Sequence, residues 1–230
     1  AGLDDVRVET FPADGTVFYG TQRSRPAWIA EFAELWELAG RDGAYRPAVR
    51  WASWDAIPMS LAQDSESADV TAELVDVGEG TAEADYAGRD VRGRIVLVAA
   101  QPEAVVRLAI ERHGAVGIVS YAQNQRSAWW GADDTLVRWG HVGSFGTTPA
   151  FGFMVSLRTA RSFRERLAAD ERIVLHATVR ARREPGHYHV VTARIAGADA
   201  RLRDEEIVFT CHLDHPRPGA NDNASGCAAI

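Results

Sequence analysis

The 230-residue sequence has no lysine: all 25 of its basic residues are arginines. Without a lysine ε-amine the chain cannot form a Schiff base with a substrate, nor build the phosphate-binding loop that depends on lysine. Long apolar runs are also missing, since no stretch reaches the roughly 18 residues that a membrane-spanning helix needs. We therefore exclude both kinds of lysine chemistry and expect no membrane partner.

Cysteine is scarce, and positive charge is not in excess. Two cysteines, Cys211 and Cys227, are too few for a fold built on disulfides. They leave the compartment open between secreted and cytoplasmic, and we favour a secreted location. The net charge is −7, whereas nucleic-acid-binding proteins typically carry an excess of positive charge, so we expect no nucleic-acid partner. The composition is that of a globular protein, and the length fits one large domain or two small ones. The sequence leaves the oligomeric state undecided.

The first 60 residues predict short strands and one helix. Residues 1–20 place apolar positions on both sides of an Asp-Gly turn, which is typical of a strand pair. Ser24 is a suitable helix cap and Gly40 a suitable helix end, and apolar residues recur between them at helical spacing. We expect an amphipathic helix there, with its aromatic residues in the core, and a further strand over 50–54.

The middle of the chain predicts a strand over 70–75 and then a βαβ unit. An apolar run over 93–98 is followed by a helical segment over 102–113 and a second apolar run over 116–119. Strands joined in this way are parallel. The turn over 99–102 contains no glycine, so backbone amides cannot approach a dinucleotide phosphate, and we reject a nucleotide site.

This region resembles the protease-associated domain, a non-catalytic insert of several peptidase families. The resemblance rests on Gly88-x-x-Val91-x-Gly93-Arg94-Ile95-Val96-Leu97-Val98 and on the segment from Ala109 to Gly114-Ala115-x-Gly117-Ile118. It covers about a hundred residues and implies a lid or substrate-gating role.

A glycine- and aromatic-rich region over 128–153 has little periodicity and predicts an ordered loop with a strand near its end. Its aromatic residues either pin the loop by packing or form a hydrophobic wall over an active site. They are Trp129, Trp130, Trp139, His141, Phe145, Phe151 and Phe153. We interpret the adjacent Asp133 and Asp134 as solvated carboxylates without a partner.

The last sixty residues carry the chemistry. Strands are predicted over 172–180 and 187–195, and a buried strand over 207–211 ends at His212-Leu213-Asp214. A loop then leads to Asp222, which stands before a helix. Ligands of open α/β sheets bind beyond the carboxyl ends of strands, so an imidazole and a carboxylate in these positions can converge on one zinc ion. Asp214 can accept the other ring N–H of His212 and fix its tautomer.

The two motifs together resemble the first metal-binding motifs of the co-catalytic zinc aminopeptidases, a family that includes glutamate carboxypeptidase-type enzymes. They are His212-Leu213-Asp214 and Pro218-Gly219-Ala220-Asn221-Asp222-Asn223-Ala224-Ser225-Gly226. The resemblance implies that His212 binds one zinc ion and that Asp222 bridges two, the number expected in a complete active site. It gives Asp214 the catalytic role of orienting His212. His215 matches no ligand position, and we interpret Cys211 and Cys227 as packing residues.

The family pattern continues with a Glu-Glu pair that supplies the general base, then an Asp and a His, and none of these follows Asp222 here. Glu205-Glu206 precedes the predicted strand and is expected at its far end from His212. We therefore expect an N-terminal part of a longer zinc metallopeptidase, inactive by itself, that acts on peptides. We favour an aminopeptidase, and the residues present do not decide between an aminopeptidase and a carboxypeptidase. The alternatives are a non-catalytic lid module with a degenerate peptidase remnant, and a glutaminyl cyclase-like enzyme with a single zinc ion.

The expected fold class is α/β. Residues 1–60 are assigned to the start of the peptidase domain, 61–168 to a protease-associated insert, and 169–230 to the start of a catalytic domain with a mixed sheet.

Overall fold

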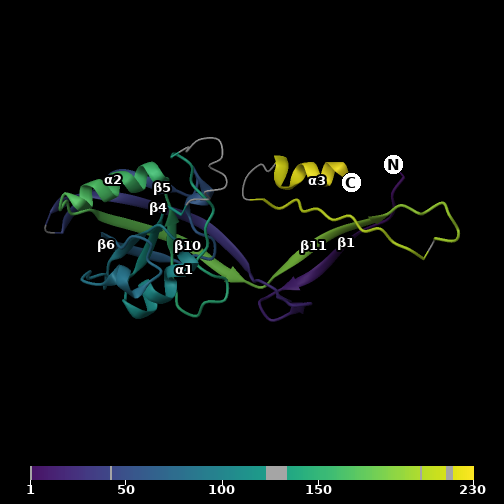
Figure 1. Ribbon diagram of the computed structural model, residues 1–230, viewed down its shortest axis with the longest axis horizontal. Helices are drawn as coiled ribbons and strands as arrows, with labels where there is room; N and C mark the ends of the chain where they lie inside the picture. Colours follow the sequence, from purple (N-terminus) through teal and green to yellow (C-terminus); the bar gives the residue numbers. More distant parts are fainter. Residues whose placement is uncertain (1, 42, 123–133, 203, 216–219) are drawn as a thin grey trace. The chain divides into compact units, whose positions relative to one another are not determined.

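The computed structural model describes residues 2–41, 43–122, 134–202, 204–215 and 220–230. The chain divides into two compact units (Figure 1). The larger unit is Asp14–Pro185, and the smaller unit combines Ala1–Ala13 with Gly186–Ile230. The larger unit includes more of the chain than the predicted insert over 61–168, because strands from the segments on both sides of that range join its sheet.

A seven-stranded mixed sheet forms the larger unit, which confirms the α/β class. Its order is β5 (Ala44–Ser53), β4 (Ala27–Arg41), β10 (Val174–Glu184), β6 (Ala68–Asp76), β7 (Ile95–Val98), β8 (Gly117–Ser120) and β9 (Gly152–Met154). Neighbours from β5 to β6 run antiparallel, and neighbours from β6 to β9 run parallel. The sheet therefore joins an antiparallel half to a parallel half.

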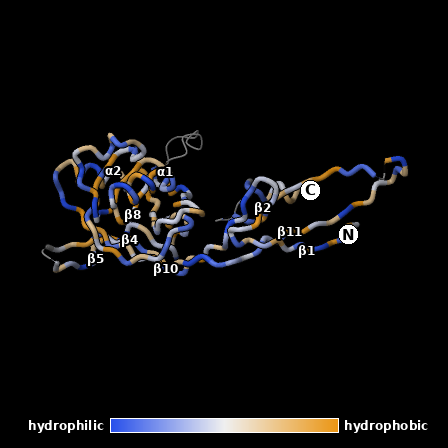
Figure 2. Tube along the Cα trace, turned by 90° about the horizontal axis from the view of Figure 1, so that it is seen from below, coloured by the Kyte–Doolittle hydropathy of each residue, from blue (hydrophilic) through white to orange (hydrophobic). Residues whose placement is uncertain are grey.

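The parallel half contains the predicted βαβ unit. Strands β7 and β8 are parallel and fully buried, and the helix between them is α1 (Pro102–Val106) continued by the π-helix η3 (Arg107–Arg112). Alternate residues of β7 enter different core clusters: Ile95 packs with the cluster that contains α2 (Leu157–Ala168), and Val96 packs with residues of α1 and η3. Because successive strand side chains point to opposite faces, helices cover both faces of the sheet, and hydrophobic segments gather between them (Figure 2).

Strand β4 replaces the helix predicted between Ser24 and Gly40, and that prediction is wrong. The segment pairs antiparallel with β10 on one edge and with β5 on the other. Ala33 and Leu35 are both buried, which is the two-residue period of a strand. The aromatic and branched residues that matched a helical face also suit a strand, and pairing along both edges decides between the two.

We predict that Leu35→Ala lowers the free energy of unfolding of the larger unit by about 2–5 kcal/mol, because Leu35 has no solvent-exposed surface and its truncation leaves a cavity. Val49→Ala on the neighbouring strand β5 is the control, since Val49 is 42 % exposed. Urea unfolding followed by tryptophan fluorescence measures both, because every tryptophan of the chain lies within residues 14–185. If both variants lowered the free energy of unfolding by the same small amount, the burial of Leu35 in strand β4 would be contradicted.

Tyr86 lies at the end of η2 (Glu83–Tyr86) and is only 3 % exposed. Its hydroxyl donates a hydrogen bond of 2.7 Å to the carbonyl oxygen of Gly80, and its ring stacks on His113 at 4.5 Å between centroids. Burial, assisted by the negative charges of Asp85 and Glu83, raises the pKa of Tyr86 to about 12. The neutral phenol is therefore the form that the folded unit holds.

We predict that Tyr86 makes stability depend on alkaline pH. Its contribution is complete below the ordinary tyrosine pKa of about 10, and it is lost as pH rises from there through the folded value of about 12. The difference in tyrosinate absorbance between the native chain and Tyr86→Phe should show one group ionising near pH 12. A difference curve centred near pH 10 would contradict the prediction.

The smaller unit is built on a two-stranded antiparallel ladder of β1 (Asp4–Ala13) and β11 (Gly186–Arg194), in which Val8 pairs with Val191. The π-helix η5 (Ala220–Ala224) and the short helix α3 (Ser225–Ala229) end the chain. Minor elements of the larger unit are the hairpin of β2 (Phe18–Tyr19) with β3 (Gln22–Arg23) and the 3-10 helix η1 (Pro58–Ser60). In the part of the chain that the structure describes, no helix has both the length and the apolar character of a membrane span.

The predicted buried strand over 207–211 is neither a strand nor buried. Residues 205–215 join no ladder with any described residue, and Ile207 is 85 % exposed. A continuous apolar run becomes a buried strand only between neighbours that cover both of its edges and faces. The only ladder described in this unit is the two-stranded one of β1 and β11, so the run has no such neighbours there.

Candidate metal centre

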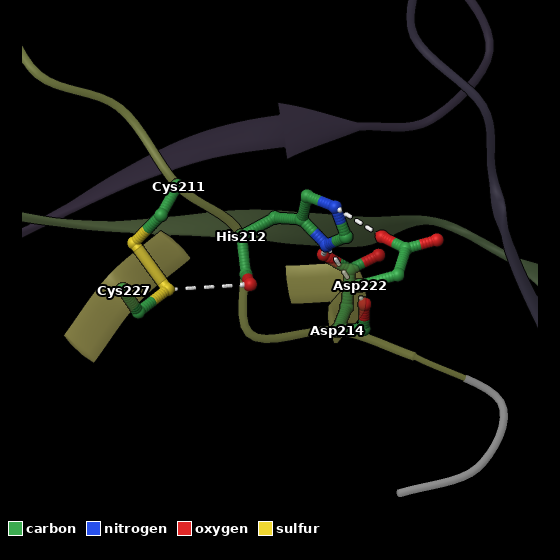
Figure 3. Close-up of a disulfide and its surroundings, with 5 residues drawn as sticks. All are labelled: Cys211, His212, Asp214, Asp222 and Cys227. Carbon is green, nitrogen blue, oxygen red and sulfur yellow. Dashed lines mark hydrogen bonds and ion pairs between the residues drawn. A yellow bond between two sulfur atoms is a disulfide. The ribbon is translucent and has the colours of Figure 1, made fainter. Parts of the chain in front are cut away.

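His212 and Asp222 converge, although they are ten positions apart. His212 follows the exposed segment over 205–211, and Asp222 lies in η5 immediately before α3. The Nε2 atom of His212 is 3.0 Å from Oδ1 of Asp222 (Figure 3). Their side chains are 49 % and 69 % exposed, so the pair is open to a ligand from solvent.

The other ring nitrogen of His212 is paired with Asp214. Nδ1 lies 3.0 Å from the backbone carbonyl oxygen of Asp214 and 3.6 Å from its carboxylate Oδ1 (Figure 3). A carbonyl only accepts, so Nδ1 carries the proton and donates it. Sequence reasoning expected the carboxylate of Asp214 to receive this bond, whereas the carbonyl of the same residue makes the shorter contact. Nε2 faces the carboxylate of Asp222, which likewise can only accept a hydrogen bond.

This donor set fits a zinc ion. With Nδ1–H donating to a carbonyl, Nε2 either carries a second proton or shares a cation with Asp222. Zinc binds imidazole nitrogen and carboxylate oxygen at about 2.0–2.2 Å, so two such ligands of a tetrahedral ion are roughly 3.3 Å apart. The observed 3.0 Å is close to that separation. Among the described residues there is no cluster of three His, Cys, Asp or Glu side chains that could complete the coordination.

Two further residues lie near Asp222. His215 Nε2 is 4.0 Å from the second carboxylate oxygen, Oδ2, at the outer limit of an ion pair. Gly226 in α3 has room for no side chain, because a Cβ there would lie 2.3 Å from Oδ1 of Asn223. The glycine therefore lets the residue after Asp222 pack against the helix. The peptide bond between Asp222 and Asn223 is cis.

Cys211 and Cys227 form a disulfide, and their interpretation as separate packing residues is wrong (Figure 3). Their Cα atoms are 5.2 Å apart, within the range that a disulfide spans. The Sγ atom of Cys227 also lies 3.4 Å from the backbone oxygen of His212. The sequence did hold a signal: the two cysteines stand immediately before His212 and shortly after Asp222. Residues 205–215 do not form the strand expected there, so a strand geometry does not set the direction of Cys211.

The other candidate carboxylates have structural roles. Asp134 is not without partners, since its carboxylate accepts hydrogen bonds from Arg158 at 2.8 Å and Arg161 at 3.4 Å, both on α2. Glu206 pairs with Arg194 of β11. Asp133 lies outside the described residues.

The aromatic residues over 128–153 divide between core and surface. Phe151 and Phe153 are buried in the main core, as the packing interpretation requires. Trp139 and Phe145 are partly exposed; Trp139 lies 5.1 Å from His141 between ring centroids, and Phe145 lies under the guanidinium of Arg23. The remaining two, Trp129 and Trp130, fall outside the described residues.

The fold is that of known aminopeptidases. The chain is similar to an aminopeptidase from Aneurinibacillus sp. strain AM-1, with a TM-score of 0.53 and 24 % identity over 99 % of this chain and 47 % of that one. A peptidase M28 precursor from Shewanella amazonensis SB2B gives a TM-score of 0.51 with 16 % identity, over 84 % of this chain and 41 % of that one. For BSAP, a zinc aminopeptidase from Bacillus subtilis, the TM-score is 0.51 and the identity 16 %, over 96 % and 45 %.

The chain thus spans less than half the length of each of these structures. No curated protein sequence matches it. The sequence model described as peptidase family M28 matches residues 190–230, the segment that contains His212, Asp214 and Asp222. This match confirms the resemblance to the zinc aminopeptidases that the two motifs indicated, over residues 190–230.

Proposed function

We propose that this chain is the N-terminal part of a zinc metallo-aminopeptidase and contributes two ligands to its metal centre. One observation carries the proposal: His212 Nε2 and Asp222 Oδ1 lie 3.0 Å apart inside the segment that matches peptidase family M28. The donor set and its open position support a bound metal ion. The similarity to a zinc aminopeptidase supports zinc and an aminopeptidase over other metallopeptidases.

In this proposal each residue has a separate task. His212 binds through Nε2, and the Asp214 carbonyl holds Nδ1–H so that the lone pair of Nε2 points to the ion. Asp222 offers both carboxylate oxygens, of which Oδ1 faces His212 and Oδ2 faces His215 at 4.0 Å. An arrangement with one oxygen on each side suits a carboxylate that bridges two ions. Asp214 is thus a positioning residue, acting through its backbone rather than its side chain.

Bound zinc lowers the pKa of a coordinated water toward neutrality and polarises a substrate carbonyl. The residues of this chain hold the site at the surface, where a peptide with a free amino terminus can approach. No glutamate follows Asp222 in the sequence, so we propose that the general base and the other ligands come from outside these 230 residues. From their separate resemblance to the protease-associated domain, residues 61–168 are proposed to act as a lid.

We predict that the 230-residue chain binds zinc with micromolar or weaker affinity, because two ligands do not fill a zinc ion's coordination. His212→Ala and Asp222→Asn should each weaken zinc binding by about tenfold or more. His176→Ala is the matched control: it removes an imidazole that pairs with Asp69 in the larger unit. Competition with a chromogenic chelator measures all four proteins. Equal zinc binding by His212→Ala and the unaltered chain would contradict the proposed centre.

The catalytic part of the proposal is tested on the longer enzyme. It should hydrolyse aminoacyl nitroanilides, lose activity with 1,10-phenanthroline and recover it with zinc. Substrates with acetylated amino termini should be resistant, which separates an aminopeptidase from a carboxypeptidase. Activity that is indifferent to the chelator would exclude metal-dependent hydrolysis. A zinc-to-protein ratio near one would favour the single-zinc cyclase-like alternative, and zinc binding without hydrolysis would favour the lid module.

We also propose an extracytoplasmic location, because disulfides persist in oxidising compartments. The support is the Cys211–Cys227 bridge, which uses both cysteines of the chain. In protein isolated from its natural host in the presence of a thiol-trapping reagent, Cys211 and Cys227 should carry no trapping group, and reduction before trapping should label both, as peptide mapping by mass spectrometry would show. Labelling of both residues without reduction would contradict this location.

A further inference from the structure

The disulfide brackets the proposed metal ligands along the chain. Cys211 is bonded to His212 through one peptide bond, and Cys227 lies in α3, five residues after Asp222. The sixteen-residue separation of the cysteines therefore encloses both ligands and the loop between them. Figure 3 shows the bridge on one side of the His212 backbone and the imidazole directed toward Asp222.

The segments that carry His212 and Asp222 have little regular structure of their own to keep them in place. Residues 205–211 pair with no strand in the described part of the chain, so no ladder of hydrogen bonds fixes the backbone that leads to His212. Helix α3 has five residues, and helices this short are marginal without tertiary contacts. Both ligand side chains are about half exposed or more, so burial does not fix their rotamers. Their 3.0 Å approach needs another constraint.

The bridge supplies that constraint covalently. It holds the Cα atoms of Cys211 and Cys227 at 5.2 Å, which brings the backbone of His212 against α3. The contact of 3.4 Å between Cys227 Sγ and the His212 carbonyl oxygen shows how close the two segments lie. Closing a loop of about 15 residues with a disulfide removes many open conformations, enough to change an equilibrium by up to roughly a hundredfold.

We propose that the Cys211–Cys227 disulfide is the positioning element of the metal centre: it preorganises His212 and Asp222 for a shared zinc ion. This inference rests on the proposed function, since it assumes that the two residues bind zinc. Opening the bridge makes zinc binding weaker. A small dithiol opens it by giving up two electrons and two protons: the Cys211–Cys227 S–S bond breaks, two thiols form, and the dithiol closes to its own disulfide.

The cleanest test removes the bridge by mutation, because free thiols and dithiol reductants bind zinc themselves. The double variant Cys211→Ser/Cys227→Ser, in the full 230-residue chain, should bind zinc about tenfold to a hundredfold more weakly than the oxidised chain. Cys211→Ala/Cys227→Ala breaks the same bridge without adding hydroxyls and should give the same loss. Chelator competition measures the affinities, and mass spectrometry verifies that the unaltered chain is oxidised.

A double-mutant cycle with His212→Ala separates positioning from a general loss of structure. In the His212→Ala background the bridge has no ligand to position, so removing it should leave the residual zinc affinity unchanged. Amide hydrogen exchange without zinc gives a readout independent of the metal. Exchange over 211–227 should accelerate in the double serine variant, while protection of β1 and β11 stays the same.

Each result decides between the hypotheses. Unchanged zinc affinity in both double variants overturns the positioning role and leaves the proposed function standing. Loss of protection across β1 and β11 in both variants also overturns it, because the bridge then maintains the fold rather than the site. If the oxidised chain binds zinc no better than His212→Ala, the proposed metal centre itself fails. Weaker binding that depends on His212, with β1 and β11 intact, supports the inference.

Discussion

Strand β10 is hydrogen-bonded along both edges, and the larger unit depends on that double pairing. On one side it pairs with β4 over its whole length, and on the other with β6, antiparallel in both cases. Without it the parallel strands β6–β9 and the antiparallel pair β4–β5 would be separate sheets, each with an unpaired edge. Buried residues of β10, including Leu175 and Ala177, lie in the same core cluster as Phe163 of α2. One strand thus joins the two halves of the sheet and its main core.

The parallel half was predictable because its signals are local and agree with one another. The apolar runs of β7 and β8 are buried on both faces, so they appear in the sequence as continuous apolar segments, and the helix between them begins at Pro102 and ends before Gly114. The antiparallel half was harder. Between Ser24 and Gly40 the sequence satisfies a helical period, but pairing along both edges decides the structure, and one of the two partners, β10, lies more than a hundred residues away along the chain. No local window contains that information.

The approach of His212 to Asp222 was predictable from the sequence, but the contacts around this pair were not. The juxtaposition of His212 with Asp222 follows from two motifs whose spacing reflects their chemistry, and the structure brings these side chains within 3.0 Å. That the Asp214 carbonyl makes the shorter contact to His212 depends on backbone direction, which residue types do not encode. The disulfide was missed because it depends on how the chain brings Cys211 and Cys227 together, and residues 205–215 do not form the strand that was expected to lead to His212.

The exposed run before His212 has a consequence for how copies of this chain behave together. Ile207, Val208 and Phe209 stand largely in solvent, in an extended segment that contains no proline. Unpaired backbone amides and carbonyls in such a segment are a template for intermolecular cross-β association. The disulfide ties the end of this segment to α3 at Cys211. The residue next to His212 is thus also the point at which this exposed run is anchored.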